Sequence, residues 1–544
     1  MKKLPNLIYG LLVFACVSPL LQRPLAAQEV LPMRVIVNSD RDGIVTSDTF
    51  LTLREAIELV NGTLPLSQLS SAEQKQVKSL NFGVQSRIEF NLPPKQTTIR
   101  LVSILPPLAS PGLIIDGTTQ RGYTTKSGKL NRTFVKAFPL PMVAITPGEN
   151  VEIFRGLTIV ANNVVVRGIS LYGFSSKHGV TASTPPADIF IADEVTARET
   201  SLQQYLQPAN LVQSQVPPQG IVIESNWLGS FPPRVDNSTR KVTVVGIAYD
   251  LPRSAFGVSI FNSLGTTIRN NLITNHDGSA IITGKQATNL RITGNVIERN
   301  GLAGMPDAIR LEGNIQNTEV ASNLIENNAG SGIFLFKPQG AVQIRDNAIS
   351  GNGKRFNRAA IYLMGNAHQV INNQIERQNG SGVVVAAYPQ SRDNKITNNQ
   401  FSNLSGLAID LVAQLNVSPQ DYQQGDGANP ITDSYQRRRK TGNFGMDAPR
   451  FLSPEFFIIS STTGVTLDGL AEPGSQIEIY RSSQKSGTRE LIGKPIATAK
   501  VDEQGRFSIN TRSLKPGERV SAIATHPQYG TSEPALNAVI ELIR

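Results

Sequence analysis

Apolar and polar residues follow one short pattern that recurs between Thr266 and Phe401. The copies read IRNNLI, ITGNVI, VASNLI, IRDNAI, VINNQI and ITNNQF. Each centres on an asparagine, and successive asparagines lie 24 to 28 residues apart: Asn271, Asn295, Asn323, Asn347, Asn373 and Asn399. A period of this size predicts an array of repeated structural units.

Large apolar residues flank each asparagine at fixed offsets, one three residues before it and one two residues after it. The following ones are Ile273, Ile297, Ile325, Ile349, Ile375 and Phe401. This alternation predicts short strands with one buried face. A second apolar run comes about ten residues later in each copy (AIIT at 280, AIRL at 308, GIFL at 332, AIYL at 360, GVVV at 382 and LAID at 407).

A single copy cannot bury its own apolar face, whereas stacked copies can. The pattern therefore predicts a right-handed parallel β-helix, with the asparagines at the corners between strands. We expect left-handed backbone geometry at these asparagines and hydrogen bonds between their side chains from coil to coil. A leucine-rich horseshoe shares the period, but its L-x-x-L-x-L signature is absent.

Residues 1–27 have the features of a signal peptide. Lys2 and Lys3 precede an apolar run from 7 to 21, and Leu25-Ala26-Ala27 fits a cleavage site. We therefore expect export, to the periplasm, the cell surface or the medium. No later apolar run is long enough to span a bilayer, so no transmembrane segment is predicted.

Residues 28–86 form the predicted N-terminal cap region. Thr52 and Glu55 have the spacing of a capping box, and Gly62 is a natural helix stop. The residues on one face of the intervening helix are apolar: Leu53, Ala56, Ile57 and Val60. A short amphipathic helix here would cover the open end of the first coil.

The loop before this helix contains a cofactor signal. Asn38, Asp40 and Asp42 match the first half of a calcium loop, but Thr49 stands where the bidentate glutamate is expected. Two interpretations remain open, a calcium site and a simple Asp/Gly turn. No other cofactor is predicted.

The remaining chain divides into three parts by pattern. Residues 87–412 form the predicted β-helix, with insertions at about 181–220 and 232–254 where the pattern stops. Residues 413–450 are an irregular linker that contains the basic run Arg437–Lys440, either a solvated loop or a contact for an acidic glycan. Residues 451–544 contain strands separated by turns at short spacing, which predicts a β-sandwich.

Several of these segments resemble known families. Leu51-Thr52-Leu53-Arg54-Glu55-Ala56 resembles the C-S-L-R-E-A motif of an N-terminal module found in bacterial secreted β-helix proteins of the pectate-lyase-like superfamily. IEFNLPPKQTTIRLVSILPPL, LIIDGTTQRGY and LAIDL are similar to the segments that follow this motif. The C-terminal part resembles bacterial immunoglobulin-like modules, which serve as spacers or anchors. The resemblance implies the architecture and export. It implies no single activity, because the wider class includes pectate lyases and polygalacturonases.

Composition narrows the chemistry. The only cysteine, Cys16, lies in the signal peptide, so the mature chain has no disulfide, thiolate metal site or cysteine nucleophile. A net charge of +10 favours an acidic polysaccharide or a lipopolysaccharide surface, although it also serves ordinary solubility.

Adjacent coils place two carboxylates together in the expected rows. Glu298 and Glu326 follow the stacked isoleucines of neighbouring copies and would lie about 4.8 Å apart. This spacing suits the catalytic pair of a retaining glycosidase, or a calcium site. The alternative is a solvated pair neutralised by Arg299 or Arg291.

The second-strand row contains a candidate substrate-binding patch. Phe334, Phe336 and Tyr362 would form an aromatic surface that suits sugar rings. Its expected polar neighbours are Asp307, Arg310 and Glu312. Alternatively, an insertion or the 413–449 segment covers the patch. His178 and His276 are isolated and fit turn residues.

The sequence favours a monomeric, non-catalytic protein that binds polysaccharide or cell-surface glycan, or mediates adhesion, and that does not bind nucleic acid. The first alternative is a polysaccharide lyase or glycoside hydrolase acting on an acidic polysaccharide. The chain lacks the Asp-Asp dipeptide of polygalacturonases and a clear pectate-lyase calcium cluster. A purely structural spacer is the other alternative.

Overall fold

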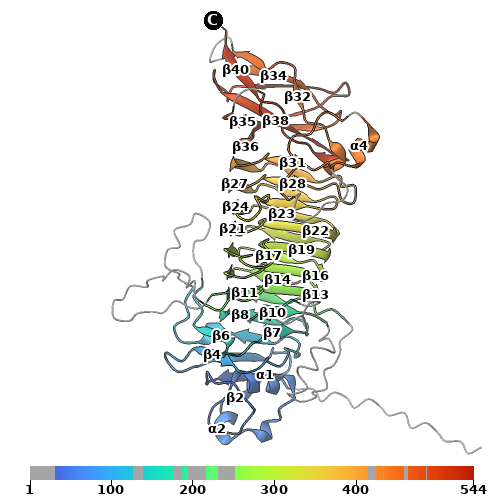
Figure 1. The fold of residues 1–544 in the computed structure, drawn as a ribbon. Helices are drawn as coiled ribbons and strands as arrows, with labels where there is room; N and C mark the ends of the chain where they lie inside the picture. Colours follow the sequence, from blue (N-terminus) through green and yellow to red (C-terminus); the bar gives the residue numbers. More distant parts are fainter. Residues whose placement is uncertain are drawn as a thin grey trace, which may run out of the picture.

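Short strands wind into coils stacked along one axis in the computed structural model of the chain (Figure 1). The structure describes residues 31–125, 139–176, 185–193, 216–230, 251–413, 423–432, 434–458, 464–484 and 487–543. The predicted signal peptide, most of both predicted insertions and His178 lie outside these residues. The described part is mostly β, and the parallel β-helix predicted from the repeat is confirmed.

Strands of successive coils pair in three long sheets, and within the stack every pairing is parallel except that of β1 with β2. The first sheet runs through β2 (Val77–Ser79), β1 (Met33–Val37), β3 (Arg87–Phe90), β5 (Ile114–Asp116), β8 (Val165–Arg167), β11 (Val222–Glu224), β14 (Thr267–Arg269), β17 (Arg291–Thr293), β20 (Thr318–Ala321), β23 (Val342–Arg345), β26 (Gln369–Ile371) and β29 (Lys395–Thr397).

The second sheet begins with β4 (Thr98–Leu101), β6 (Val143–Pro147), β9 (Ile169–Leu171), β12 (Trp227–Leu228), β15 (Leu272–Thr274), β18 (Val296–Glu298), β21 (Leu324–Glu326), β24 (Ala348–Ser350), β27 (Gln374–Gln378) and β30 (Gln400–Leu404). The third sheet runs through β7 (Arg155–Ile159), β10 (Ala187–Ile191), β13 (Val258–Leu264), β16 (Ile281–Thr288), β19 (Ile309–Asn314), β22 (Ile333–Gln339), β25 (Ile361–Leu363), β28 (Val383–Val385) and β31 (Ile409–Leu411).

The predicted inner column is continuous. Ile273 pairs with Ile297 and Ile297 with Ile325, and the register continues through Ile349 and Ile375 to Phe401. All six side chains are fully buried. Burial of a complete Ile side chain stabilises by about 1.5–3 kcal/mol, so this column is a main source of stability.

The asparagines form the predicted ladder. Asn323 Nδ2 donates to Asn347 Oδ1 at 3.0 Å and to the Ile292 carbonyl at 2.8 Å, and the neighbouring rungs repeat these bonds. The expected left-handed geometry was misplaced by one residue. The residue before each ladder asparagine has positive φ, as at Asn270 (55°) and Asp346 (55°), because the ladder residue must turn its amide inward.

A second ladder, not predicted from the sequence, lies five residues after the first. Asn300 donates to Asn328 and Asn328 to Asn352, at 3.0 and 2.9 Å. His276 and Gln378 occupy the same offset in the flanking copies. Two buried amide ladders thus hold the turns on both sides of the second sheet.

The N-terminal helix α1 (Leu53–Asn61) covers the first coil. Thr52 and Glu55 form the predicted capping box, and Gly62 ends the helix with φ of 75°. Below it lie η1 (Leu66–Gln68) and α2 (Ser71–Gln74), and η2 (Gly117–Thr119) follows β5. The resemblance of this region to a named N-terminal module remains a prediction.

The insertion predicted at 181–220 contains a regular strand. β10 pairs with β7 and β13 in the third sheet, and all five of its residues are buried. The predicted insertion is therefore interrupted by one strand of the β-helix.

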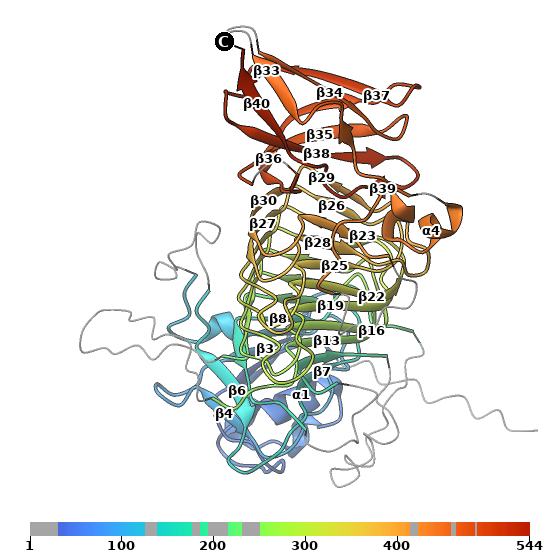
Figure 2. The ribbon, with the colours of Figure 1, turned by 45° about the horizontal axis from the view of Figure 1, so that its top comes forward.

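The C-terminal part is built on two sheets. One extends the second sheet of the β-helix through β36 (Ile492–Lys500), β35 (Gln476–Ser482), β38 (Arg519–His526) with β39 (Gly530–Thr531), β40 (Ala538–Leu542) and β33 (Glu455–Ile458). The other contains β32 (Arg450–Phe451), β34 (Val465–Leu470) and β37 (Arg506–Thr511). The immunoglobulin-like assignment remains a prediction. Figure 2 shows this C-terminal unit resting on the last coils of the stack.

The predicted linker 413–450 is not wholly irregular. α4 (Tyr435–Arg439) contains most of the basic run, capped by Ser434, whose Oγ accepts a hydrogen bond from Arg437 N. η5 (Gly442–Gly445) follows it. None of the described helices has the length and hydropathy needed to cross a bilayer.

Candidate functional site

The last coil has no further coil to bind its backbone N–H groups, and the C-terminal unit supplies the acceptors. Glu533 Oε1 accepts from Leu411 N at 3.2 Å, and Thr531 Oγ1 accepts from Ile396 N at 2.8 Å. The Glu478 carboxylate accepts from Asn398 N at 3.0 Å. The C-terminal unit is therefore docked on the open strand edges of the last coil through side-chain acceptors.

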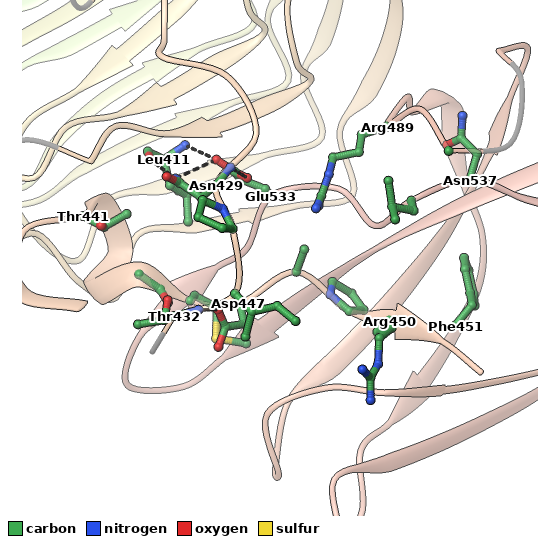
Figure 3. Close-up of a pocket in the computed structure, with 18 of the residues that line it drawn as sticks. Leu411, Asn429, Thr432, Thr441, Asp447, Arg450, Phe451, Arg489, Glu533 and Asn537 are labelled. Carbon is green, nitrogen blue, oxygen red and sulfur yellow. Dashed lines mark hydrogen bonds between the residues drawn. The ribbon is translucent and has the colours of Figure 1, made fainter. Parts of the chain in front are cut away.

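A pocket of about 340 Å³ lies beside the Glu533 contact (Figure 3). Its lining comes from the last coil, the α4–η5 segment and the C-terminal unit: Leu411, Asn429, Pro430, Ile431, Thr432, Arg437, Thr441, Gly445, Met446, Asp447, Ala448, Pro449, Arg450, Phe451, Ser453, Pro454, Gly487, Arg489, Glu533, Leu536, Asn537 and Ala538. Apolar walls with a few convergent polar groups are typical of ligand sites.

Three arginines give this pocket its positive charge. Arg437 comes from α4, Arg450 from β32 and Arg489 from the loop before β36. Arg489 Nη1 donates to the Pro534 carbonyl at 2.6 Å, which fixes one end of its guanidinium. Arginines from three segments that line one cavity suit a carboxylate or sulfate ligand.

Two carboxylates also line the pocket. Asp447 is paired outside it, since its Oδ2 is 3.3 Å from Nη2 of Arg438. Glu533 instead accepts only neutral donors: Leu411 N, and Asn429 N and Nδ2 at 2.7 and 2.9 Å. Figure 3 shows these bonds, with Arg489 beside them.

Asp410 is in β31, next to Leu411, whose N–H donates to Glu533. Its carboxylate accepts from Asp426 N at 3.2 Å and from Gly427 N at 3.1 Å. Burial raises the pKa of Asp410 to about 8, with repulsion from Glu533 and Asp426 adding to the shift. Burial likewise raises the pKa of Glu533 to about 7, against the opposing effect of its hydrogen bonds and Arg489.

The structure brings Glu298 and Glu326 together as predicted. They are direct partners in the pairing of β18 with β21. Glu298 is only 5% exposed, however, so a polymer chain has little access to its carboxylate. The adjacency is confirmed, and a catalytic role for the pair stays a prediction.

The expected exposed aromatic patch is wrong for two of its three rings. Phe334 and Tyr362 point outward from the third sheet but are 0% exposed. They pack in a separate apolar cluster with Ala359, whose N–H bonds the Gln423 carbonyl at 2.7 Å. The chain beyond β31 thus returns to this face, which was the alternative left open.

The polar neighbours of these rings are also engaged. The Arg310 guanidinium lies 4.9 Å from the Phe334 ring centroid and 4.6 Å from that of Phe336, and it pairs with Glu312 at 3.1 Å. Asp307 is buried and binds Arg358 Nη1 with both carboxylate oxygens, at 2.9 and 3.1 Å. Phe336 and Glu312 remain partly exposed, and substrate binding by these residues stays a prediction.

The proposed calcium loop is held by protein contacts. Both Asp42 oxygens bond the Arg54 guanidinium, at 2.8 and 2.9 Å, and Asn38 Oδ1 accepts from Leu51 N. In the part of the chain that the structure describes, no contact of the Asp40 side chain brings it to the same point as Asn38 and Asp42. Among the described residues, no three His, Cys, Asp or Glu side chains gather as a metal site requires. The geometry therefore favours the turn over calcium.

His276 is not an isolated turn residue. Its Nε2 lies 2.9 Å from Asp188 Oδ2 and its Nδ1 lies 2.8 Å from Asn300 Oδ1, while Ser254 bonds the other oxygen of Asp188. Burial raises the pKa of Asp188, and His276 opposes that shift. Although the residue types are those of a hydrolase triad, the aspartate separates serine from histidine, so the serine has no base.

The sequence analysis missed the pocket because its residues are dispersed over more than 120 positions of the chain. The one signal was the basic run at 437–440, already considered as a glycan contact. Only Arg437 of that run lines the pocket.

Comparisons with known proteins agree with the fold. Residues 235–369 match the family described as "Right handed beta helix region". No curated protein matches the chain. Three similar solved structures are ORF18 of Geobacillus virus E2 (11% identity, 92% of this chain and 76% of that chain, TM-score 0.44), the periplasmic alginate epimerase AlgG (12%, 73% and 77%, 0.39) and the Streptococcus pneumoniae surface protein and adhesin PfbA (18%, 60% and 86%, 0.34). These values are too low to transfer an activity.

Proposed function

We propose that this protein is exported and binds an acidic polysaccharide, without cleaving it, in the pocket between the last coil and the C-terminal unit. The observation that carries the proposal is that Arg437, Arg450 and Arg489, from three separate segments, all line one cavity. Its polar groups at Thr432 and Asn537 suit sugar hydroxyls.

Several further features support a binder. The net charge of +10 attracts a polyanion over long distances. Phe451, Ile431 and Leu536 supply apolar lining beside the arginines, as sugar rings require. Glu533, one of the two carboxylates that line the pocket, accepts hydrogen bonds from backbone and amide donors on both of its oxygens. This geometry fits a docking contact better than a nucleophile.

The test is binding of polygalacturonate, alginate and neutral dextran to the mature chain. We expect the two polyuronates to bind and dextran not to bind, with affinity falling as salt rises. Arg450→Ala should weaken polyuronate binding about tenfold or more, as loss of one charge-assisted hydrogen bond does. Arg506→Ala is the matched control, because Arg506 is exposed on the same three-stranded sheet outside the pocket.

Equal weakening by both arginine substitutions would show nonspecific attraction and contradict the proposed site. The same mixtures should be assayed for new reducing ends and unsaturated uronates. Release of either product, abolished by Glu298→Gln or Glu326→Gln, would replace the binder with the enzyme alternative. Absence of any polysaccharide ligand would favour a structural spacer.

A further inference from the structure

Glu533 and Asp410 form a buried acidic pair with little compensation by positive charge. Each is 2% exposed. Within the described residues, neither carboxylate has a Lys, Arg or His nitrogen within salt-bridge distance. Buried carboxylates without a salt bridge are costly in the ionised form.

The surroundings of the pair are mainly acidic. Asp426 approaches from the loop after β31 and raises the pKa of both groups, while Arg489 approaches Glu533 from the loop before β36 and lowers it. Arg437, Arg450 and Asp447 complete the charged lining of the pocket, and Asp447 is paired with Arg438. Glu533 is therefore the one pocket carboxylate that lacks a cationic partner within bonding distance.

Its location connects this group to the ligand. Glu533 lines the cavity, and Arg489 is the cation that acts on it most directly. When Glu533 is ionised, its charge offsets Arg489 and repels an entering carboxylate. When Glu533 is protonated, the positive charge of Arg489 is no longer offset and attracts the carboxylate of the ligand.

We propose that Glu533 is the specificity-determining residue of this pocket, which accepts an anionic sugar when Glu533 carries a proton and rejects it when Glu533 is ionised. The inference rests on the proposed function and adds its regulation. Binding then takes up a proton, because a bound uronate stabilises the neutral acid. Ionised Glu533 in turn raises the pKa of Asp410, so the two carboxyls titrate as a coupled pair.

The sign follows from the raised pKa values of about 7 and 8. Uronates remain ionised at any pH well above about 4, so the ligand does not titrate in the relevant range. Raising the pH from about 6 to about 8.5 ionises Glu533 and should weaken trigalacturonate binding about tenfold or more, with the change centred near neutrality.

The first experiment measures this affinity by calorimetry across that range, in buffers of different ionisation enthalpy. We expect proton uptake on binding near pH 7.5, falling towards zero at low pH. Glu533→Gln should remove the pH dependence while the chain still binds. Glu490→Gln is the matched control, an acid of the same unit outside the pocket lining, and should leave the pH dependence unchanged. Binding with no proton uptake at any pH would overturn the inference and leave the proposed function standing.

A second measurement does not need a ligand. Thermal stability of the full chain and of Glu533→Gln is recorded against pH, and the difference between the curves isolates Glu533. The unaltered chain should lose stability relative to the variant as pH rises through about 7, because its folded state binds the extra proton. Parallel curves would overturn the inference even if no polyuronate binds. If the variant fails to fold, proton uptake by the unaltered chain decides.

Discussion

Tyr480 of the C-terminal unit packs against Phe401, the last member of the inner column, with ring centroids 6.2 Å apart. Its hydroxyl lies 3.2 Å from the carbonyl of Asn399, the last rung of the ladder. The contact covers both the apolar interior and the amide ladder where they end. The C-terminal unit therefore closes the β-helix, a role different from the spacer that sequence resemblance implied.

This closure predicts that the β-helix is not independent of residues 450–543. Removing them would expose the ends of β29, β30 and β31, and open strand edges associate. We expect the truncated chain to aggregate or to melt well below the full chain. A truncated chain that elutes as a monomer with the same melting temperature would contradict the capping role.

The buried pair of Arg54 and Asp42 predicts a second effect. Their side chains are 7% and 1% exposed, and Arg54 also donates to the carbonyls of Ser103 and Ile104. Arg54→Met leaves the Asp42 charge buried and should cost about 3–5 kcal/mol of unfolding free energy. Arg41→Ala, at an exposed neighbour, should change it by less than about 0.5 kcal/mol. Urea titration of both variants makes the comparison.

The same contacts predict no calcium effect. Because Arg54 already occupies both Asp42 oxygens, excess calcium should leave the melting temperature of the chain unchanged relative to a chelator. A rise in melting temperature with calcium, lost in Asp40→Asn, would restore the calcium site.

The ladder can be tested at one rung. Asn323 accepts from Asn295 N and Nδ2 and donates to Asn347, all within the buried interior. Asn323→Ala leaves several polar groups unpaired and should cost about 2–4 kcal/mol. Gln343→Ala, an exposed amide on β23 of the next coil, is the matched control and should be nearly neutral. Equal shifts of the urea midpoint in the two variants would contradict a stabilising role for the ladder.

His368 predicts the acid limit of stability. Its Nδ1 accepts from Val342 N and its Nε2 lies 2.8 Å from the Met364 carbonyl, so the buried ring is held neutral. Burial lowers its pKa to about 4. The unfolded chain takes up this proton near pH 6.5, so stability should fall by up to about 3 kcal/mol as pH drops from there to about 4. His368→Gln should flatten that slope in pH-dependent melting, and an unchanged slope would contradict the assignment.

Local features of this chain were predictable from the sequence. The column from Ile273 to Phe401 and the capping box of Thr52 and Glu55 depend on spacings of a few residues or one repeat, which the sequence shows directly. The adjacency of Glu298 and Glu326 follows from the same repeat, because equivalent positions must pair once the coils stack.

Other features depend on chain that returns from far away. Phe334 and Tyr362 are buried on a face of the β-helix to which the chain returns at Gln423. No local sequence pattern predicts this return. The pocket brings Leu411 and Glu533 together, although a loop and a sheet lie between these two residues in the sequence. Asp188 lay hidden in an apparent insertion because its side-chain partners Ser254 and His276 belong to other coils.

Each interior rung of the asparagine ladder receives and passes on the same set of hydrogen bonds. A whole coil could therefore be gained or lost between Asn295 and Asn373 while every ladder amide keeps a hydrogen-bond partner. The number of coils can then change in evolution. The two ends of the β-helix, which Arg54 closes at the N-terminal end and Tyr480 at the C-terminal end, depend instead on side chains that are not repeated from coil to coil.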